Sequence, residues 1–305
     1  MASHVEAVQE KRSAALSSVV AAVGLTTMKL IVGLLTGSLG ILSEAAHSGL
    51  DLVAALVTLF AVQTSDKPAD DNHHFGHGKI ENVSALVETL LLLATCAWII
   101  YEAIQRLFFK QVHVEASIWA FLIMGVSIVV DFTRSRILKQ AADKHKSQAL
   151  EADALHFSTD IWSSSVVILG LVGIKLAEWF PGLKFLAAAD AVAALGVSLI
   201  VIYVSLQLGR RSIEALLDTA PQGLAEKITR AVAAMPEIED IHQIRVLPSG
   251  ANMFIEAHVY LKGTTSLEET HVLMDKVENV IRSIVPDADV TIHPEPLAAT
   301  HRTTG

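Results

Sequence analysis

Residues Leu39–Gln63 read LGILSEAAHSGLDLVAALVTLFAVQ. The segment is mostly apolar and longer than the roughly 20 residues that cross a bilayer as a helix. Near its middle it carries His47 and Asp51, four residues apart, a spacing that places both side chains on one face of a helix. Ionisable groups are expensive in lipid and normally face a polar path. The segment therefore predicts a membrane helix with one chemically active face.

Similar apolar segments recur through the first two thirds of the chain. With 52% hydrophobic residues, the 305-residue chain is too apolar for an ordinary soluble domain. We predict an α-helical membrane protein whose residues 1–212 form a six-helix transmembrane bundle, with both termini on one side. The predicted spans are Ala14–Thr36, Leu39–Gln63, Val83–Leu107, Ile118–Leu138, Ala149–Leu176 and Leu186–Leu208.

The distribution of lysine and arginine predicts the orientation. Eleven lie on the side of the termini and four on the other side, so the positive-inside rule predicts cytoplasmic termini. Lys29 falls inside the first span and is costly there unless it finds a partner. Short loops and a plain N-terminus favour a bacterial inner membrane. The eleven are Lys11, Arg12, Lys67, Lys79, Arg134, Arg136, Lys139, Lys144, Lys146, Arg210 and Arg211; the four are Arg106, Lys110, Lys175 and Lys184.

The last third of the chain has the pattern of a water-soluble domain. From Asp218 onward it has 13 acidic and 7 basic residues, and the chain as a whole has a net charge of -9, which argues against nucleic acid as a partner. The element order αββαβ predicts a cytoplasmic α+β domain over residues 213–305, with helices on one face of a small sheet. The predicted elements are Leu224–Ala234, Ile238–Leu247, Asn252–Lys262, Ser266–Val285 and Asp289–His293, with a turn at Pro248-Ser249-Gly250 and a capping box from Ser266 to Glu269.

A second His/Asp pair lies in the fifth span, which contains DALHFSTD over Asp153–Asp160. It shares the pattern acid-Ala-x-His-x-x-x-Asp with the second span. Each aspartate is about 12 residues into its span, or roughly 18 Å at 1.5 Å per residue. Two facing helices would supply two imidazoles and two carboxylates, a tetrahedral set that suits zinc. The predicted site is His47, Asp51, His156 and Asp160; the alternative is hydrogen bonding that only holds the bundle together.

The connection after the second span reads DKPADDNHHFGHGK from Asp66 to Lys79. Asp70, His73 and His77 have metal-ligand spacing, and three ligands with an open position would form a labile surface site. His74 and Asp71 are spare candidates in the same loop. The alternative is a solvated acidic loop with incidental histidines.

Four histidines of the tail fall on or beside its predicted elements: His242, His258, His271 and His293. Glu295 follows two residues after the last of them, and strand residues two apart share a face. These residues are candidate metal ligands, although scattered histidines in a soluble domain are also common on plain surfaces.

Together these features resemble the cation diffusion facilitator family. The resemblance covers nearly the whole chain: six spans, the two His/Asp motifs, the stretch FGHGKIE from Phe75 to Glu81, and the acidic tail. It implies a homodimeric exporter that exchanges metal for protons, with a metallochaperone-like αββαβ tail that binds metal at the dimer interface.

The resemblance also implies roles for individual residues. It places the transport site at His47, Asp51, His156 and Asp160, and a loop site at Asp70, His73 and His77. In the tail the matching ligands are His242, His258 and His293, with His271 bridging and Glu295 where relatives often carry Asp. Lys79 and Asp218 match a charge pair that holds the dimer near the membrane boundary.

One departure from the family pattern bears on which metal is transported. Many bacterial members have Asp where this chain has His47, and the version with two His and two Asp resembles the zinc-preferring members. Imidazole is softer than carboxylate and disfavours hard ions such as manganese. We predict a transporter, not an enzyme, that exports Zn²⁺ in exchange for protons and also binds Zn²⁺ as a structural or regulatory ligand. Export of cadmium, cobalt, ferrous iron or manganese stays open, as does a metal-stabilised membrane scaffold or sensor that moves nothing.

Overall fold

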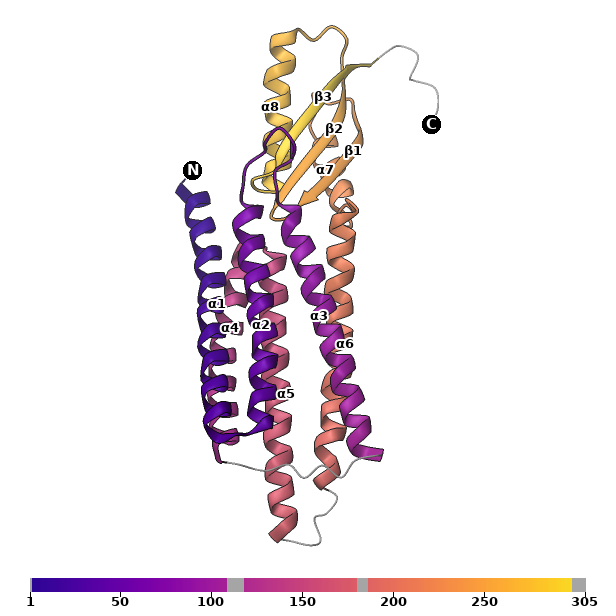
Figure 1. The fold of residues 1–305 in the computed structure, drawn as a ribbon. Helices are drawn as coiled ribbons and strands as arrows, with labels where there is room; N and C mark the ends of the chain where they lie inside the picture. Colours follow the sequence, from indigo (N-terminus) through magenta and orange to yellow (C-terminus); the bar gives the residue numbers. More distant parts are fainter. Residues whose placement is uncertain (1, 109–117, 180–185, 298–305) are drawn as a thin grey trace. The chain divides into compact units, whose positions relative to one another are not determined.

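The computed structural model describes residues 2–108, 118–179 and 186–297 (Figure 1). The described chain forms two compact units. The first comprises the residues up to Pro68 together with Ile80–Ile213, and the second comprises Ala69–Lys79 and the chain from Glu214 onward. The loop between the second and third helices therefore groups with the tail rather than with the helices that it connects.

The first unit consists, over its described residues, of six long helices, as predicted. The shortest has 27 residues, more than a bilayer crossing needs. Lipid offers no hydrogen bonds to the backbone, so apolar segments of this length satisfy their own backbone groups as helices. Within the part of the chain that the structure describes, three stretches are apolar and long enough to cross a membrane: Val5–Thr36, Ile41–Ser65 and Lys79–Gln105. The helices are α1 (Ala2–Thr36), α2 (Leu39–Ser65), α3 (Lys79–Phe108), α4 (Ile118–His145), α5 (Gln148–Trp179) and α6 (Leu186–Leu216).

Several helices run beyond the predicted apolar spans. The largest differences are at the start of α1, twelve residues earlier than predicted, and at the ends of α4 and α6. Hydropathy marks only the part of a helix that prefers lipid, whereas polar ends stay helical when tertiary contacts hold them. At the start of α1, buried Lys11 forms ion pairs with Asp66 and Glu81 and so ties this end to α2 and α3.

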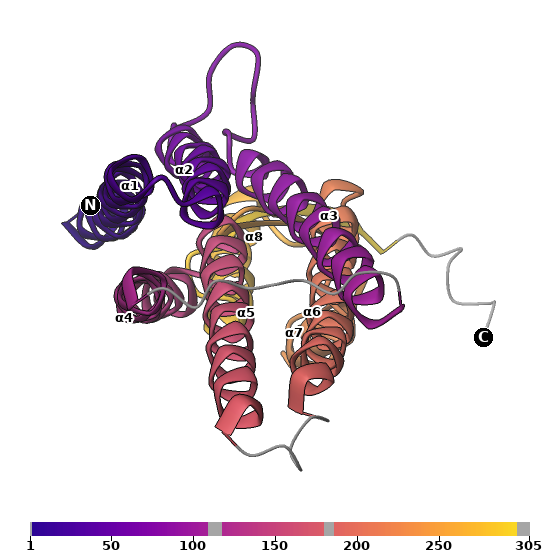
Figure 2. The ribbon, with the colours of Figure 1, turned by 60° about the horizontal axis from the view of Figure 1, so that its bottom comes forward.

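Four of the helices form a continuous packed group. α1 contacts α2 and α4, α4 contacts α5, and α2 contacts α5, while α3 and α6 lie together on the other side of α5 (Figure 2). Arg134 is only 4% exposed inside this group. Lys11 is equally buried, so neither acts as a loop charge, and nine of the eleven residues counted on the terminus side remain for the orientation argument. Lys110 and Lys184 lie outside the described residues.

The second unit contains the predicted αββαβ fold. Its strands are ordered β1-β2-β3, with β1 antiparallel and β3 parallel to the central β2. Both helices bury apolar residues against one face of the sheet, including Val232 from α7 and Val277 from α8. The predicted capping box is confirmed at Ser266 and Glu269. The elements are α7 (Leu224–Ala233), β1 (Asp240–Ser249), β2 (Asn252–Leu261), α8 (Leu267–Ile284) and β3 (Asp289–Pro296).

The predicted turn between β1 and β2 was too long. Pro248 and Ser249 still pair with β2, so the chain reverses only after them, at Gly250 with φ 61°. Proline has no backbone N–H to donate, and it is tolerated here because β1 is an edge strand.

Candidate metal centres

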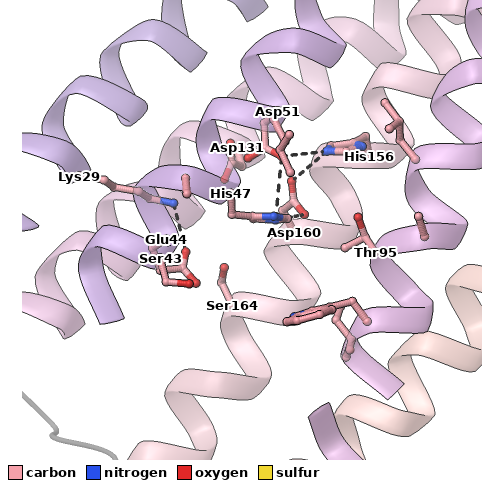
Figure 3. Close-up of a pocket in the computed structure, with 16 residues that line it drawn as sticks. Lys29, Ser43, Glu44, His47, Asp51, Thr95, Asp131, His156, Asp160 and Ser164 are labelled. Atoms are coloured by element: carbon pink, nitrogen blue, oxygen red, sulfur yellow. Dashed lines mark hydrogen bonds and ion pairs between the residues drawn. The ribbon is translucent and has the colours of Figure 1, made fainter. Parts of the chain in front are cut away.

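The first candidate centre lies where α2 and α5 face each other. His47 and Asp51 project from α2, and His156 and Asp160 project from α5, each pair one helical turn apart (Figure 3). The structure brings all four predicted residues together.

Ligand atoms of His47, Asp51 and Asp160 lie close enough to surround one ion, and His156 contacts both of these carboxylates. His156 Nε2 lies 3.1 Å from Asp51 Oδ1 and 3.6 Å from Asp160 Oδ2. His47 Nε2 lies 3.9 Å from Asp51 Oδ1 and 3.8 Å from Asp160 Oδ1. His47, Asp51 and Asp160 each offer a ligand atom within 4.8 Å of the others. Two nitrogens and two oxygens so arranged form a donor set typical of zinc.

A cavity of about 690 Å³ gives access to this cluster. The side chains of His156 and Asp51 are only 5% and 11% exposed, whereas the His47 side chain, also in the cavity wall, is 38% exposed. The rest of the wall is partly apolar and includes Leu91 and Trp98 of α3. Of the four ligands, His47 is thus the most exposed and His156 the most buried.

Sequence reasoning missed two groups in the wall of this cavity. Asp131 of α4 is 7% exposed and accepts a hydrogen bond from Arg134 Nη1 at 3.2 Å. Lys29 of α1, noted only as costly, pairs with Glu44 of α2. The available signal was the same for both: each is a charged residue inside an apolar segment.

The second candidate centre is the loop of Asp70, His73 and His77. Ligand atoms of the three residues lie within 4.8 Å of one another. The backbone N–H groups of Asn72 and His73 donate to Asp70 Oδ1, and these bonds hold the pKa of Asp70 below its ordinary value. The charged carboxylate is therefore available to a metal at neutral pH. The spare candidates Asp71 and His74 contact each other through the Asp71 carbonyl and are not part of the cluster.

Contacts with the tail hold this loop in place. The ring of Phe75 meets Phe254 of β2 edge-on at 5.1 Å, and Lys79 forms the predicted ion pair with Asp218. Gly78 packs directly on the end of β1: a Cβ at Gly78 would lie 2.2 Å from the carbonyl oxygen of Ser249. Only glycine allows this approach, so the loop cluster rests on the sheet.

The third candidate centre lies on the sheet face opposite the helices. His242, His258 and Glu295 offer ligand atoms within 4.8 Å of one another. Glu295 joins the group from β3: its carboxylate is 2.7 Å from His258 Nδ1 and 3.6 Å from His242 Nε2. The hydrogen bond with His258 lowers the pKa of Glu295. His293 is at the edge, with its Nε2 3.9 Å from Glu295 Oε1.

A β-bulge sets which way His242 points. The register of β1 shifts between His242 and Arg245, and Gln243 has a positive φ of 49°. The extra residue changes the alternation, so that Ile241 and Ile244 both pack on the core. His242 then pairs with His258 on the opposite face.

His271 does not join this cluster within one copy of the chain. It is exposed on α8, in the helical layer, while the other ligands occupy the opposite face of the sheet. The sequence could not show this, because the layer of a helix relative to a strand face depends on the tertiary fold.

Comparison with known proteins identifies the family. Residues 15–217 match the cation efflux transmembrane domain, and residues 220–297 match the cation efflux protein cytoplasmic domain. The chain belongs to the cation diffusion facilitator family. The cation-efflux pump FieF of Yersinia enterocolitica is 32% identical over 290 residues, covering 94% of this chain and 93% of the relative. FieF of Cronobacter sakazakii is 30% identical over 290 residues, covering 95% and 94%.

Two solved structures that match cover about a quarter of the chain each. A structure titled "Mode of Action of a Putative Zinc Transporter CzrB" is 27% identical and covers 26% of this chain and 99% of its own, with a TM-score of 0.25. As a cation diffusion facilitator, the chain is a membrane transporter for the efflux of divalent metal cations.

Proposed function

We propose that this cation diffusion facilitator exports Zn²⁺ from the cytoplasm in exchange for protons. The observation that carries the proposal is the cluster of two imidazoles and two carboxylates at the end of a cavity in the helical unit. Imidazole nitrogen favours zinc over harder ions such as manganese. A transport assay in which manganese is carried as well as zinc would contradict this selectivity.

Proton exchange follows from the chemistry of the ligands. A histidine or carboxylate binds metal only in its deprotonated form, so binding releases protons and protons in turn displace the metal. The unequal exposure of the ligands, 38% for the His47 side chain and 5% for that of His156, supports alternating access, in which the helices rock so that the cluster opens to one side at a time. Asp51, His156 and the ions that they bind would thus be exposed first to the cytoplasm and then to the outside.

We further propose a homodimer in a bacterial inner membrane, with residues 1–212 in the membrane and residues 213–305 in the cytoplasm. The separate apolar core of the tail supports this division. The loop cluster and the tail cluster would bind zinc as regulatory sites, and the Lys79–Asp218 pair would hold the dimer near the membrane boundary. Because His271 lies on the helical layer, it can bridge to a tail site only if a second copy of the chain supplies it.

The test is zinc uptake into proteoliposomes under a proton gradient. We expect Asp51→Ala to lower uptake by more than the roughly 10–100-fold typical of losing a group that only supports a ligand. Asp143→Ala is a matched control, because Asp143 is an exposed carboxylate on α4 with a 64% exposed side chain. Wild-type uptake in Asp51→Ala would overturn the assignment. A protein that binds zinc but moves none in wild type would support the scaffold or sensor instead.

A further inference from the structure

Two acidic side chains outside the metal cluster are completely enclosed in the helical unit. Glu88 of α3 and Asp153 of α5 are each 0% exposed, and neither lines the cavity that holds the cluster. Ionisable groups in the membrane-spanning part of a protein are costly, and they commonly mark the path of an ion or a proton. The proposed set of metal ligands leaves both acids without a role.

The hydrogen bonds of both acids are incomplete. Thr58 of α2 donates from its Oγ1 to Glu88 Oε1, and Ser18 of α1 donates to Asp153 Oδ2 at 3.0 Å. The second oxygen of each acid, Glu88 Oε2 and Asp153 Oδ1, is buried and accepts no hydrogen bond from the residues that the structure describes. A buried carboxylate oxygen without a donor is unfavourable, whereas a protonated carboxyl group carries no charge and can itself donate.

The electrostatic surroundings distinguish the two acids. Arg134 of α4 stabilises the anion of Asp153, and its Nη2 also donates to Ser18 Oγ at 3.0 Å. The hydrogen-bond donor of Glu88 is the uncharged hydroxyl of Thr58, and the charged group that acts on Glu88 is Asp153, which repels it. Two enclosed carboxylates that repel each other are stabilised when one of them binds a proton. Of the two acids, Glu88 is therefore the one that favours a proton.

The packing of three helices keeps water away from Glu88. Its carboxyl group is bonded to α2 and interacts with Asp153 of α5. About one turn before Glu88, Ala85 is 0% exposed and packs with Ala152, the residue that precedes Asp153. The dry surroundings of Glu88 thus depend on α3 lying against α5, and water would reach the carboxyl group if these helices moved apart.

We propose that Glu88 is a proton-binding site of the carrier, separate from the metal cluster. It holds a proton while α3 lies against α5, and it releases this proton to water when the helices rock apart. The inference rests on the proposed transport function, because the rocking motion is that of alternating access. The protons on the metal ligands are exchanged for the ion, whereas the proton on Glu88 follows the conformation of the helices and is bound in the metal-free protein as well.

Infrared spectroscopy can detect the bound proton directly. A protonated carboxyl group has a C=O stretch that carboxylates lack, and most side-chain carboxyl groups are ionised at about pH 7. We expect the metal-free full-length protein to show such a band, and Glu88→Gln to lower it, because the amide has the same shape but binds no proton. Asp143→Asn is the matched control and should keep the full band, because the Asp143 side chain is 64% exposed. An identical band in wild type and Glu88→Gln, or no band in wild type, overturns the inference.

Zinc uptake into proteoliposomes tests whether this proton takes part in transport. Glu88→Gln imitates a proton that never leaves, so we expect uptake to fall about tenfold, equivalent to about 1.4 kcal/mol in the barrier. Zinc titration should give the wild-type number of bound ions, which shows that the variant is folded. Glu88→Asp keeps an acid at this position and should restore most of the uptake. Wild-type uptake in Glu88→Gln overturns the inference, whereas a wild type that shows the infrared band but moves no zinc would overturn the transport function itself.

Discussion

The cluster between α2 and α5 and the cluster on the tail sheet are built from the same ligand types but differ in enclosure. The first gathers four donors from two helices, with His156 and Asp51 almost fully buried. The second draws its donors from three strands and leaves His258 and Glu295 each nearly 30% exposed on an open sheet face. An enclosed cluster can control which side an ion reaches, whereas an open one can accept a further ligand from another molecule.

The strongest test of whether the two clusters have separate roles is to remove one carboxylate or imidazole from each. We expect Asp160→Asn to reduce zinc flux by about 100-fold or more, because it removes one of four enclosed donors while the tail still binds metal. His258→Ala should weaken metal binding in the tail but leave flux at saturating zinc nearly unchanged. Zinc titration measures metal binding, and a proteoliposome assay measures zinc flux, in both full-length variants. Equal loss of flux in the two variants would show that the clusters do not act separately.

Gly78→Ala tests the contact between the loop cluster and the end of β1. In Gly78→Ala the new methyl group would meet the Ser249 carbonyl, so the loop or the strand must move. We expect a loss of about 1–3 kcal/mol in the stability of the tail unit, the range typical of overpacking. Zinc binding at Asp70 and His77 should also weaken. Thermal unfolding of the metal-free protein, followed with and without added zinc, measures both effects, and an unchanged unfolding temperature would contradict the close contact.

The smallest expected effect is the pH dependence that the tail cluster gives to the stability of the tail. The His258 bond lowers the pKa of Glu295 in the folded tail. A carboxyl group whose pKa is lowered by folding adds stability above its ordinary pKa of about 4.3, and this stability is lost as the pH falls through the lowered value. Metal-free wild type should therefore unfold at a higher temperature than Glu295→Gln at pH 6, and the difference should shrink below about pH 4. A difference that grows at acidic pH would contradict the assigned hydrogen bond.

Much of the tail and of the loop cluster was predictable because their patterns are local. The alternation of β2 and the capping box of α8 depend on residues a few positions apart, and both are present as expected. The spacing of Asp70, His73 and His77 likewise brings three ligands together within one loop. The helix ends were less predictable, because ion pairs such as Lys11–Asp66 extend α1 past its apolar part.

By itself, the sequence determined that the chain has six long apolar helices and that two of them carry His and Asp one turn apart, because helical periodicity is a property of neighbouring residues. Only the tertiary structure decided that the two pairs meet. It also placed Asp131 and Lys29 in the wall of the cavity that contains these pairs. In the tail, it decided that a bulge at Gln243 turns His242 toward His258, while His271 lies in the helical layer. These outcomes depend on how whole helices and strands pack, and such contacts join residues far apart in the chain.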